Sequence, residues 1–158
     1  MEAGKIQVYY GEGQGKSSAA LGNAVRAGSR GKTAYIIHFM KYDENVDFMK
    51  GLEPNVKIFR FEKSERGFDD LTDEEKSDEK QNIANGLNFA KKALVTEECD
   101  VLVLDEVLGL IDEGIITNGD LLNILNEKSL FSTVILTGRS LPDEIRKAAD
   151  EVLNIMPE

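Results

Sequence analysis

The chain has 158 residues, of which 41% are hydrophobic and 30% charged, so length and composition indicate one globular domain over residues 1–158. Its 19 basic and 29 acidic residues give a net charge of −10, which argues against a broad basic face for nucleic acid. No apolar stretch reaches the roughly 20 residues that span a bilayer, and no targeting peptide is recognised. Cys99, the single cysteine, cannot form an internal disulfide. We therefore expect a cytoplasmic protein without membrane or nucleic-acid partners.

Strands and helices alternate in the first part of the chain. Residues 5–10 are rich in β-forming side chains and stop at a glycine, which predicts a first strand. After a glycine-rich turn, small and apolar residues recur at helical spacing over residues 16–26, and glycines from Gly28 onward are expected to end that helix. Residues 33–40 form an apolar run typical of a strand buried on both faces. Residues 56–61 alternate apolar and basic side chains, which indicates a strand nearer an edge of the sheet.

A long helix is predicted next. Thr72 and Glu75 have the spacing of a capping box, so we expect the helix to begin there and to run to about residue 97. The acidic run over residues 62–79 is interpreted as a solvated loop and helix start, with the docking of a basic partner as the alternative. The apolar residues 101–104 then predict a central strand.

The last part of the chain continues the alternation. Thr117 begins another capping pattern, and the apolar residues after it predict a short helix. Residues 133–136 are predicted as a strand, Pro142 suits the first turn of a helix over residues 143–149, and residues 152–155 are expected to close the sheet. This alternation implies a three-layer α/β fold with a mainly parallel sheet, in which ligands bind at the carboxyl ends of the strands.

A glycine-rich loop with a lysine and two serines joins the first predicted strand to the first helix. In that context the glycines let backbone N–H groups point inward, Lys16 supplies charge to phosphates, and Ser17 supplies a hydroxyl to a magnesium ion. The sequence departs from GxxxxGK[ST] because Tyr10 stands where the pattern begins with glycine. We interpret the loop as a P-loop for the triphosphate of ATP, the alternative being an ordinary glycine-rich turn. The expected phosphate-binding residues are Gly11, Glu12, Gly13, Gln14, Gly15, Lys16, Ser17 and Ser18.

The central strand carries Asp105 and Glu106 to the same edge of the sheet. In P-loop proteins an acidic residue at the end of an apolar strand holds the magnesium ion, directly or through water. We therefore predict a metal site made by Ser17, Asp105 and Glu106. It is expected to take Mg²⁺ or Mn²⁺, since both ions prefer oxygen ligands.

Three further residues are each open to two interpretations. Arg139 follows Thr137 and Gly138 at the end of a strand, so it is expected either at the phosphates or substrate, or on the surface. His38 ends an apolar strand and lies either at the same edge or in the core with a hydrogen-bond partner. Cys99 is interpreted as a small packing residue rather than as a reactive thiol.

Nearly the whole chain resembles one known family, the P-loop type of corrinoid adenosyltransferases. The resemblance rests on the segments VYYGEGQGKSSAALGNAVRAGSRGK, YIIHFMK, VLVLDE and LTGRSLPDEIRKAAD, which occur in the family's order and spacing. It implies a RecA-like P-loop NTPase fold, a homodimer, and transfer of the 5′-deoxyadenosyl group of ATP to the Co(I) of a corrinoid with release of triphosphate. It also implies an electron donor that reduces the cobalt.

The resemblance assigns roles to individual residues. It implies that the loop holds the triphosphate, that Asp105 and Glu106 serve the magnesium and the nucleotide, and that Arg26 lies near the nucleotide. Phe68 matches a family phenylalanine that packs against the corrinoid and displaces its lower ligand, the alternative being an ordinary loop aromatic. The residues expected to support catalysis are therefore Lys16, Phe68 and Glu106.

Two departures from the family pattern leave other functions open. The family loop continues after its phenylalanine with threonine and tryptophan, whereas Phe68 is followed here by Asp69, Asp70 and Leu71, and the chain contains no tryptophan. His38 stands where the family has a glutamine. One alternative is a non-catalytic ATP-binding module that senses nucleotide or escorts a corrinoid. Another is a nucleotide kinase, for which the chain offers few arginines to build a lid.

Overall fold

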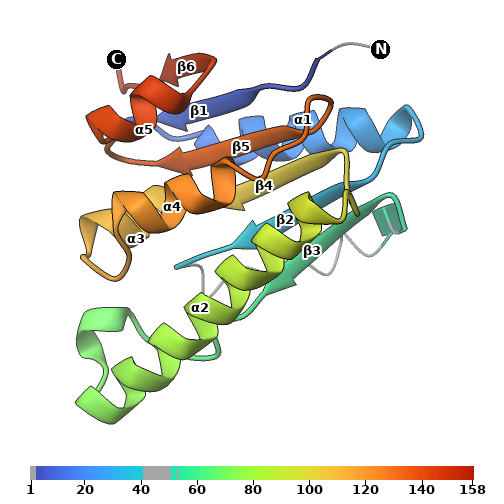
Figure 1. Ribbon diagram of the computed structural model, residues 1–158. Helices are drawn as coiled ribbons and strands as arrows, with labels where there is room; N and C mark the ends of the chain where they lie inside the picture. The colour runs from blue at the N-terminus through green and yellow to red at the C-terminus, as the bar shows by residue number, and fades with distance from the viewer. Residues whose placement is uncertain (1–2, 41–50, 53) are drawn as a thin grey trace.

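A six-stranded sheet forms the centre of the computed structural model, which describes residues 3–40, 51–52 and 54–158 (Figure 1). Every pairing among the described strands is parallel, and the strands follow the order β3-β2-β4-β5-β1-β6. The position of β3 at one edge confirms the prediction from its alternating side chains. The strands are β1 (Ile6–Tyr10), β2 (Ala34–His38), β3 (Val56–Arg60), β4 (Val101–Asp105), β5 (Thr133–Gly138) and β6 (Glu151–Asn154).

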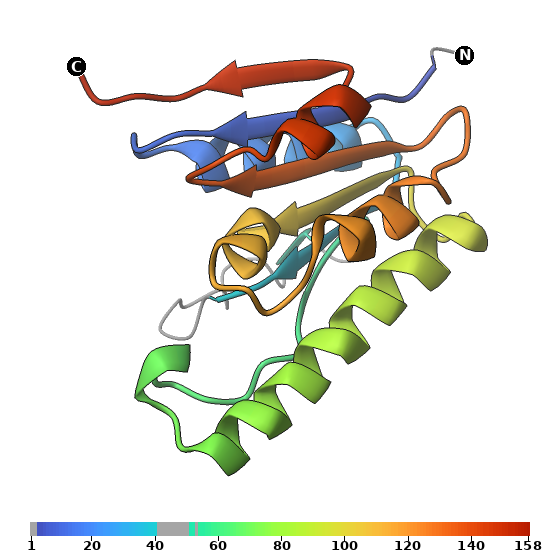
Figure 2. The same cartoon turned by 60° about the vertical axis from the view of Figure 1, so that its left-hand side comes forward.

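Helices cover both faces of the sheet, which confirms the three layers predicted from the sequence (Figures 1 and 2). Helix α1 (Lys16–Ser29) covers one face, where Ala20 and Ala24 pack against the strands. Because apolar side chains are buried on both faces, the central strands read as continuous apolar runs. The opposite face carries α2 (Asp73–Val95), α3 (Val107–Asp112), α4 (Asn118–Leu125) and α5 (Asp143–Ala148).

Both predicted capping boxes are present. Thr72 Oγ1 accepts a hydrogen bond from the backbone N–H of Glu75 at 3.2 Å, and Glu75 Oε1 accepts one from Thr72 N at 3.1 Å. Thr117 and Asp120 make the same reciprocal pair at the start of α4. These bonds satisfy backbone donors that the first turn of a helix leaves unpaired. Pro142 precedes α5 as its N-cap residue rather than lying in its first turn, because its ψ of 143° is extended.

Helix α1 is longer than predicted, and Gly28 does not end it. Gly28 lies inside the helix and is buried. A Cβ at Gly28 would lie 2.7 Å from Cγ2 of Val56, so the glycine permits a close approach of α1 to β3. The helix ends at Ser29, and Gly31 follows in the left-handed region with a φ of +81°. Gly28 is therefore required for packing against β3, and the spacing of glycines in the sequence cannot distinguish this role from the end of a helix.

Helix α3 was missing from the prediction. It has only 6 residues, no side chain caps it, and its N-cap residue Glu106 has a φ of 63°. A helix this short shows too little periodicity to be recognised in sequence. It nevertheless matters for the site, because it begins directly after the acidic residues of β4.

Candidate active site

The glycine-rich loop follows β1 at the carboxyl edge of the sheet and is anchored on β5 and on the segment after β6. The N–H of Gly11 donates to the carbonyl of Gly138 at 3.2 Å, and the N–H of Gly13 donates to the carbonyl of Ile155 at 2.8 Å. A Cβ at Gly11 would lie 2.2 Å from that Ile155 oxygen, and Gly11 has a φ of +127°. Glycine is thus required here both for the backbone conformation and for the close contact with the segment after β6.

Lys16 and Ser17 open α1 directly beside the loop. Gly15 precedes them as the N-cap residue, with a φ of 103°. The Lys16 ammonium donates to the carbonyl of Gly13 at 2.6 Å, so its side chain folds back over the loop. Glycine loop, helix N-terminus and lysine therefore surround one point, which is the arrangement that binds an anion such as a phosphate group. Glu12, Gln14 and Ser18 lie on the exposed side of this segment.

Asp105 connects three elements at the centre of the site. The residue is 1% exposed, and Oδ1 accepts hydrogen bonds from Ser17 Oγ and Thr137 Oγ1, each at 2.7 Å. Its Oδ2 lies 2.9 Å from Nδ1 of His38. The sheet register explains these contacts, because β4 lies between β2 and β5 and pairs His38 with Asp105. His38 therefore lies at the edge and is also hydrogen-bonded, so its two interpretations are not exclusive.

The surroundings of Asp105 keep its side chain charged. Burial raises the pKa of the carboxyl, but hydrogen bonds from His38, Thr137 and Ser17 outweigh burial and hold the pKa below its ordinary value. A buried carboxylate with a serine hydroxyl in contact is a pair of oxygen ligands suited to a hard divalent cation. The predicted metal ligands Ser17 and Asp105 are thus brought together.

Glu106, the third predicted ligand, continues from Asp105 into the start of α3. Its N–H donates to Thr137 Oγ1 at 2.8 Å, so the same threonine hydroxyl fixes both acidic residues. No group of three or more His, Cys, Asp or Glu side chains within the described part of the chain is arranged to hold a metal ion. A cation at Ser17 and Asp105 would therefore complete its shell with phosphate oxygens and water, as magnesium does on bound nucleotides. The donor set fits magnesium in that role.

A cavity of about 580 Å³ adjoins the acidic pair. Glu106 and Arg139 line it together with Met40 and Glu113, so Arg139 reaches the predicted edge although its side chain is exposed. Burial raises the pKa of Asp112 in the same cavity, and the charge of Arg139 partly offsets that effect. We refer to this space as the edge cavity.

Phe68 lines a second cavity, of about 360 Å³, which we call the Phe68 cavity. Phe68 belongs to the short 3-10 helix Phe68–Asp70, the green turn below α3 in Figures 1 and 2. Met40 and Glu113 line both cavities, so the space beside Phe68 adjoins the nucleotide edge. The ammonium of Lys76 lies 5.7 Å from the centre of the Phe68 ring. Of the predicted catalytic residues, Phe68 and Glu106 thus line adjoining cavities, whereas Lys16 lies at the start of α1 and is not among the described residues that line either one.

The acidic run after β3 is only partly the solvated segment that the sequence indicated. Glu79 is 6% exposed, and its carboxylate accepts hydrogen bonds from the backbone of Lys63 at 2.9 Å and of Ser64 at 3.3 Å. Glu62 accepts one from the N–H of Met40 at 2.8 Å. These acids attach the loop before Phe68 to α2 and to the end of β2. Glu62 and Glu79 accept bonds from backbone N–H groups that are distant in sequence, and such contacts cannot be recognised in the sequence.

Other predicted residues lie away from this region. Arg26 is exposed near the far end of α1, about 15 Å along the helix axis from Lys16 at about 1.5 Å per residue. It lines a cavity of about 330 Å³ with Lys32 and Thr133 at the amino ends of the strands, so a single chain does not bring it to the loop. Cys99 is buried, and burial raises the pKa of its thiol to about 12, as a packing residue requires. Lys41, part of a quoted family segment, lies outside the described residues.

One functional residue was not assigned a role in advance. Thr137 was placed at the edge by its position after a strand, but its bonds to Asp105 and Glu106 were not foreseen. A small hydroxyl residue at the end of a strand beside an acidic strand is the signal that points to such a contact.

The fold and this constellation define a class. A parallel sheet with a glycine loop and Lys-Ser after β1, a buried aspartate ending β4, and β5 between these two strands is a P-loop NTPase of the RecA-like kind. The structure is similar in fold to the flagellar accessory protein FlaH from Methanocaldococcus jannaschii, with a TM-score of 0.62 and 16% identity, covering 98% of this chain and 72% of that one. None of the described helices is long and apolar enough to cross a membrane.

The family follows from sequence comparison. The model of the family ATP:corrinoid adenosyltransferase BtuR/CobO/CobP matches residues 2–158, and the chain belongs to this family. It is 31% identical over 156 residues to a corrinoid adenosyltransferase of Escherichia coli (strain K12), covering 99% of this chain and 78% of the relative. It is 30% identical to the corrinoid adenosyltransferase CobA of Salmonella typhimurium with the same coverage. The family, the fold and the transfer of an adenosyl group from ATP to a corrinoid, expected from the sequence, are thereby confirmed.

Proposed function

We propose that the chain binds magnesium and ATP at the loop from Gly11 to Ser17 and transfers the adenosyl group to a corrinoid held beside Phe68. The contact of Asp105 with Ser17 and Thr137 carries this proposal, because it joins the phosphate loop, the acidic strand and β5 at one point. The edge cavity is lined by Glu106, the residue after Asp105, and it shares Met40 with the Phe68 cavity, which supports two substrates lying next to each other.

The reaction needs positioning more than acid–base chemistry. The electron pair of Co(I) attacks C5′ of ATP, the C5′–O bond breaks, and triphosphate leaves with the bonding electrons. The cobalt substrate is itself the nucleophile, so no side chain has to remove a proton. The protein contributes by aligning the two reactants and by neutralising the leaving group.

The residues of the loop are suited to that neutralisation. Lys16 would exchange its bond to the Gly13 carbonyl for a phosphate oxygen, and the N–H groups at the start of α1 would point toward the same anion. A magnesium or manganese ion held by Ser17 and Asp105 would supply further positive charge to the triphosphate. Glu106 and Arg139 line the edge cavity, which supports a role for both in orienting the nucleotide.

Several features of the working enzyme belong to the same proposal. We propose that it acts in the cytoplasm, where ATP is available, with a separate electron donor that reduces the cobalt. A homodimer is supported by exposed apolar side chains next to the loop, with Leu153 on β6 56% exposed and Met156 66% exposed. The role of Arg26 in nucleotide binding stays a prediction.

The test is an anaerobic assay. The protein is mixed with ATP, magnesium and chemically reduced cob(I)alamin, the visible spectrum is followed for a light-sensitive Co–C bond, and triphosphate is measured. Lys16→Ala is expected to lower the rate by about 100-fold or more, because it removes the charge beside the leaving group. Lys92→Ala, a change of the same kind at an exposed position on α2, should retain activity.

Two outcomes would replace the proposal. Binding of ATP without either product, also with earlier corrinoid precursors, would leave a non-catalytic ATP-binding module. Formation of ADP in place of triphosphate would indicate phosphoryl transfer and hence a kinase.

A further inference from the structure

Carboxylates dominate the lining of the Phe68 cavity. Among its described lining residues the cationic side chain is that of Arg66, which makes an ion pair with Glu75. The ion pair reduces what Arg66 can offer to a negatively charged ligand. The acids that line the cavity are Glu62, Asp69, Asp70, Glu79 and Glu113.

The acids of this cavity fall into two groups. Glu62 and Glu79 accept backbone N–H bonds from neighbouring segments, so their oxygens are engaged in holding the fold. Asp69, Asp70 and Glu113 are exposed at the rim, where a bound ligand meets them first. The charge that a substrate encounters is therefore set by these three rim acids.

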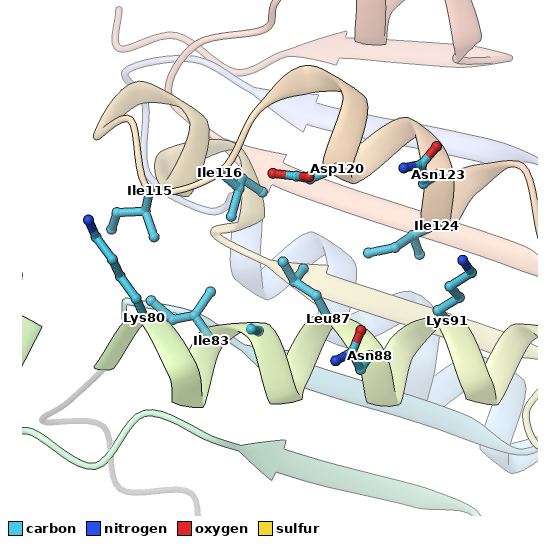
Figure 3. Close-up of a pocket in the computed structure, with 11 residues that line it drawn as sticks. Lys80, Ile83, Leu87, Asn88, Lys91, Ile115, Ile116, Asp120, Asn123 and Ile124 are labelled. Atoms are coloured by element: carbon cyan, nitrogen blue, oxygen red, sulfur yellow. The ribbon is translucent and has the colours of Figure 1, made fainter. Parts of the chain in front are cut away.

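Lys76 and Lys80 lie near Phe68 in sequence but are not among the residues that line this cavity. Lys80 lines a different cavity, of about 310 Å³, between α2 and α4, where Figure 3 shows it beside Ile115. Ile115 also lines the Phe68 cavity, so the two spaces lie on either side of it. Lys76 is placed over the Phe68 ring and faces the aromatic surface. A strong negative potential at the rim is therefore expected in a chain whose net charge is −10.

Corrinoids differ in the charge of their periphery. The acetate and propionate side chains around the ring are either free carboxylates or carboxamides, depending on how far the molecule has been amidated. A carboxylate placed beside Asp69 and Asp70 is repelled, whereas a carboxamide donates N–H hydrogen bonds to the same oxygens. Asp69 and Asp70 stand where the family pattern has threonine and tryptophan. The negative charge at these two positions is therefore a difference between this chain and the family pattern.

We propose, resting on the function proposed above, that Asp69, Asp70 and Glu113 determine substrate choice by favouring amidated corrinoids over corrinoids with free peripheral carboxylates. The discrimination arises from repulsion of the wrong substrate as much as from attraction of the right one. It acts on corrinoid binding and leaves the chemistry at the cobalt unchanged. The enzyme is thus specialised for corrinoids that have already passed through amide-forming steps.

The test compares two corrinoid substrates, neither of which carries the lower nucleotide substituent of cobalamin. Rates are measured anaerobically with saturating ATP for reduced cobinamide, which is amidated, and reduced cobyrinic acid a,c-diamide, which keeps free carboxylates. We expect kcat/KM to favour cobinamide by about fivefold or more at low ionic strength, and the preference to shrink as salt screens the rim. The double variant Asp69→Asn with Asp70→Asn should lower the preference by about threefold or more, through faster reaction of the carboxylated substrate.

A matched control removes the same charge elsewhere. Glu98→Gln with Glu127→Gln changes exposed acids near the amino ends of β4 and β5, away from the Phe68 cavity, and should keep the wild-type preference. Equal kcat/KM for both corrinoids in the wild type, or an unchanged preference in the Asp69/Asp70 variant, would overturn the inference while adenosyl transfer stands. If ATP binds but neither corrinoid is adenosylated, the proposed function itself fails. The salt dependence of the wild type decides the matter even if the double variant does not fold.

Discussion

The substitution Thr137→Val tests whether the bonds around Asp105 hold the carboxyl edge of the sheet. Valine keeps the shape of threonine and removes the hydroxyl. Thr137 is 0% exposed, and that hydroxyl donates to Asp105 Oδ1 at 2.7 Å and accepts from the N–H of Glu106 at 2.8 Å. Two partners are therefore lost at once, and water cannot readily replace them.

The expected magnitude follows from these two contacts. A hydrogen bond to a charged group contributes about 1.5–3 kcal/mol, and a buried donor without an acceptor costs about 1–3 kcal/mol. Because one hydroxyl serves both partners, the two losses do not add fully, and the free energy of unfolding should fall by about 2–4 kcal/mol. For a domain of this size, that corresponds to a melting temperature lower by about 5–15 °C.

Urea and thermal denaturation measure this loss, and titration with ATP and magnesium measures its effect on the site, where weaker binding is expected. Thr133→Val is the matched control on the same strand, since Thr133 Oγ1 accepts a long, exposed bond from the N–H of Lys5 at 3.3 Å. It should cost less than about 1 kcal/mol. Thr137→Ser, which keeps the hydroxyl, should recover most of the loss. An equal loss of unfolding free energy in Thr137→Val and Thr133→Val would refute this reasoning.

Three other predictions concern separate parts of the molecule. Gly11→Ala should weaken binding of ATP with magnesium about tenfold or more, because its Cβ would collide with the Ile155 carbonyl. The control is Gly22→Ala in α1, where a Cβ has open space, so this variant should bind ATP normally and be more stable by about 1 kcal/mol. Equal binding of ATP by both variants would contradict the anchoring of the loop. Burial raises the pKa of Glu62 above 4.5, so its contribution to stability is complete below the pKa of the unfolded chain and is lost as pH rises through the native pKa. Glu62→Gln should therefore gain stability relative to the wild type as pH rises above about 4.5 in urea denaturation, whereas a pH-independent difference would count against this prediction. With a pKa of about 12, Cys99 should react with a thiol reagent only as the protein unfolds, and rapid labelling of the native state would show the assignment to be wrong.

The parts of the site that lie within one stretch of sequence were predictable. Gly11, Lys16 and Ser17 follow a strand and open a helix, and Asp105 ends an apolar run, so local pattern and fold class together placed them at one edge. The contact between Ser17 and Asp105 was implied by that placement and is present. Patterns of this kind carry enough information because a parallel sheet brings the ends of its strands together.

Contacts that depend on strand order were not predictable. His38 and Thr137 flank Asp105 because β4 lies between β2 and β5, and neither the order nor the register is written in local patterns. Helix α3 was missed because it is short and uncapped, and Gly28 was misread because its reason is contact with Val56 on another element. In each case the deciding interaction joins residues that are distant in sequence.

The hydrogen bond from the N–H of Gly13 to the carbonyl of Ile155 couples the phosphate loop to the pairing of β6 with the sheet. The loop is made early during synthesis, but the carbonyl that anchors it is made after β6, the last strand of the sheet. This anchor of the phosphate loop thus requires that β6 has joined β1, a pairing between opposite parts of the chain. Because ATP would bind the chain in this joined state, bound ATP should stabilise the pairing of β6 with β1 against local opening of that strand.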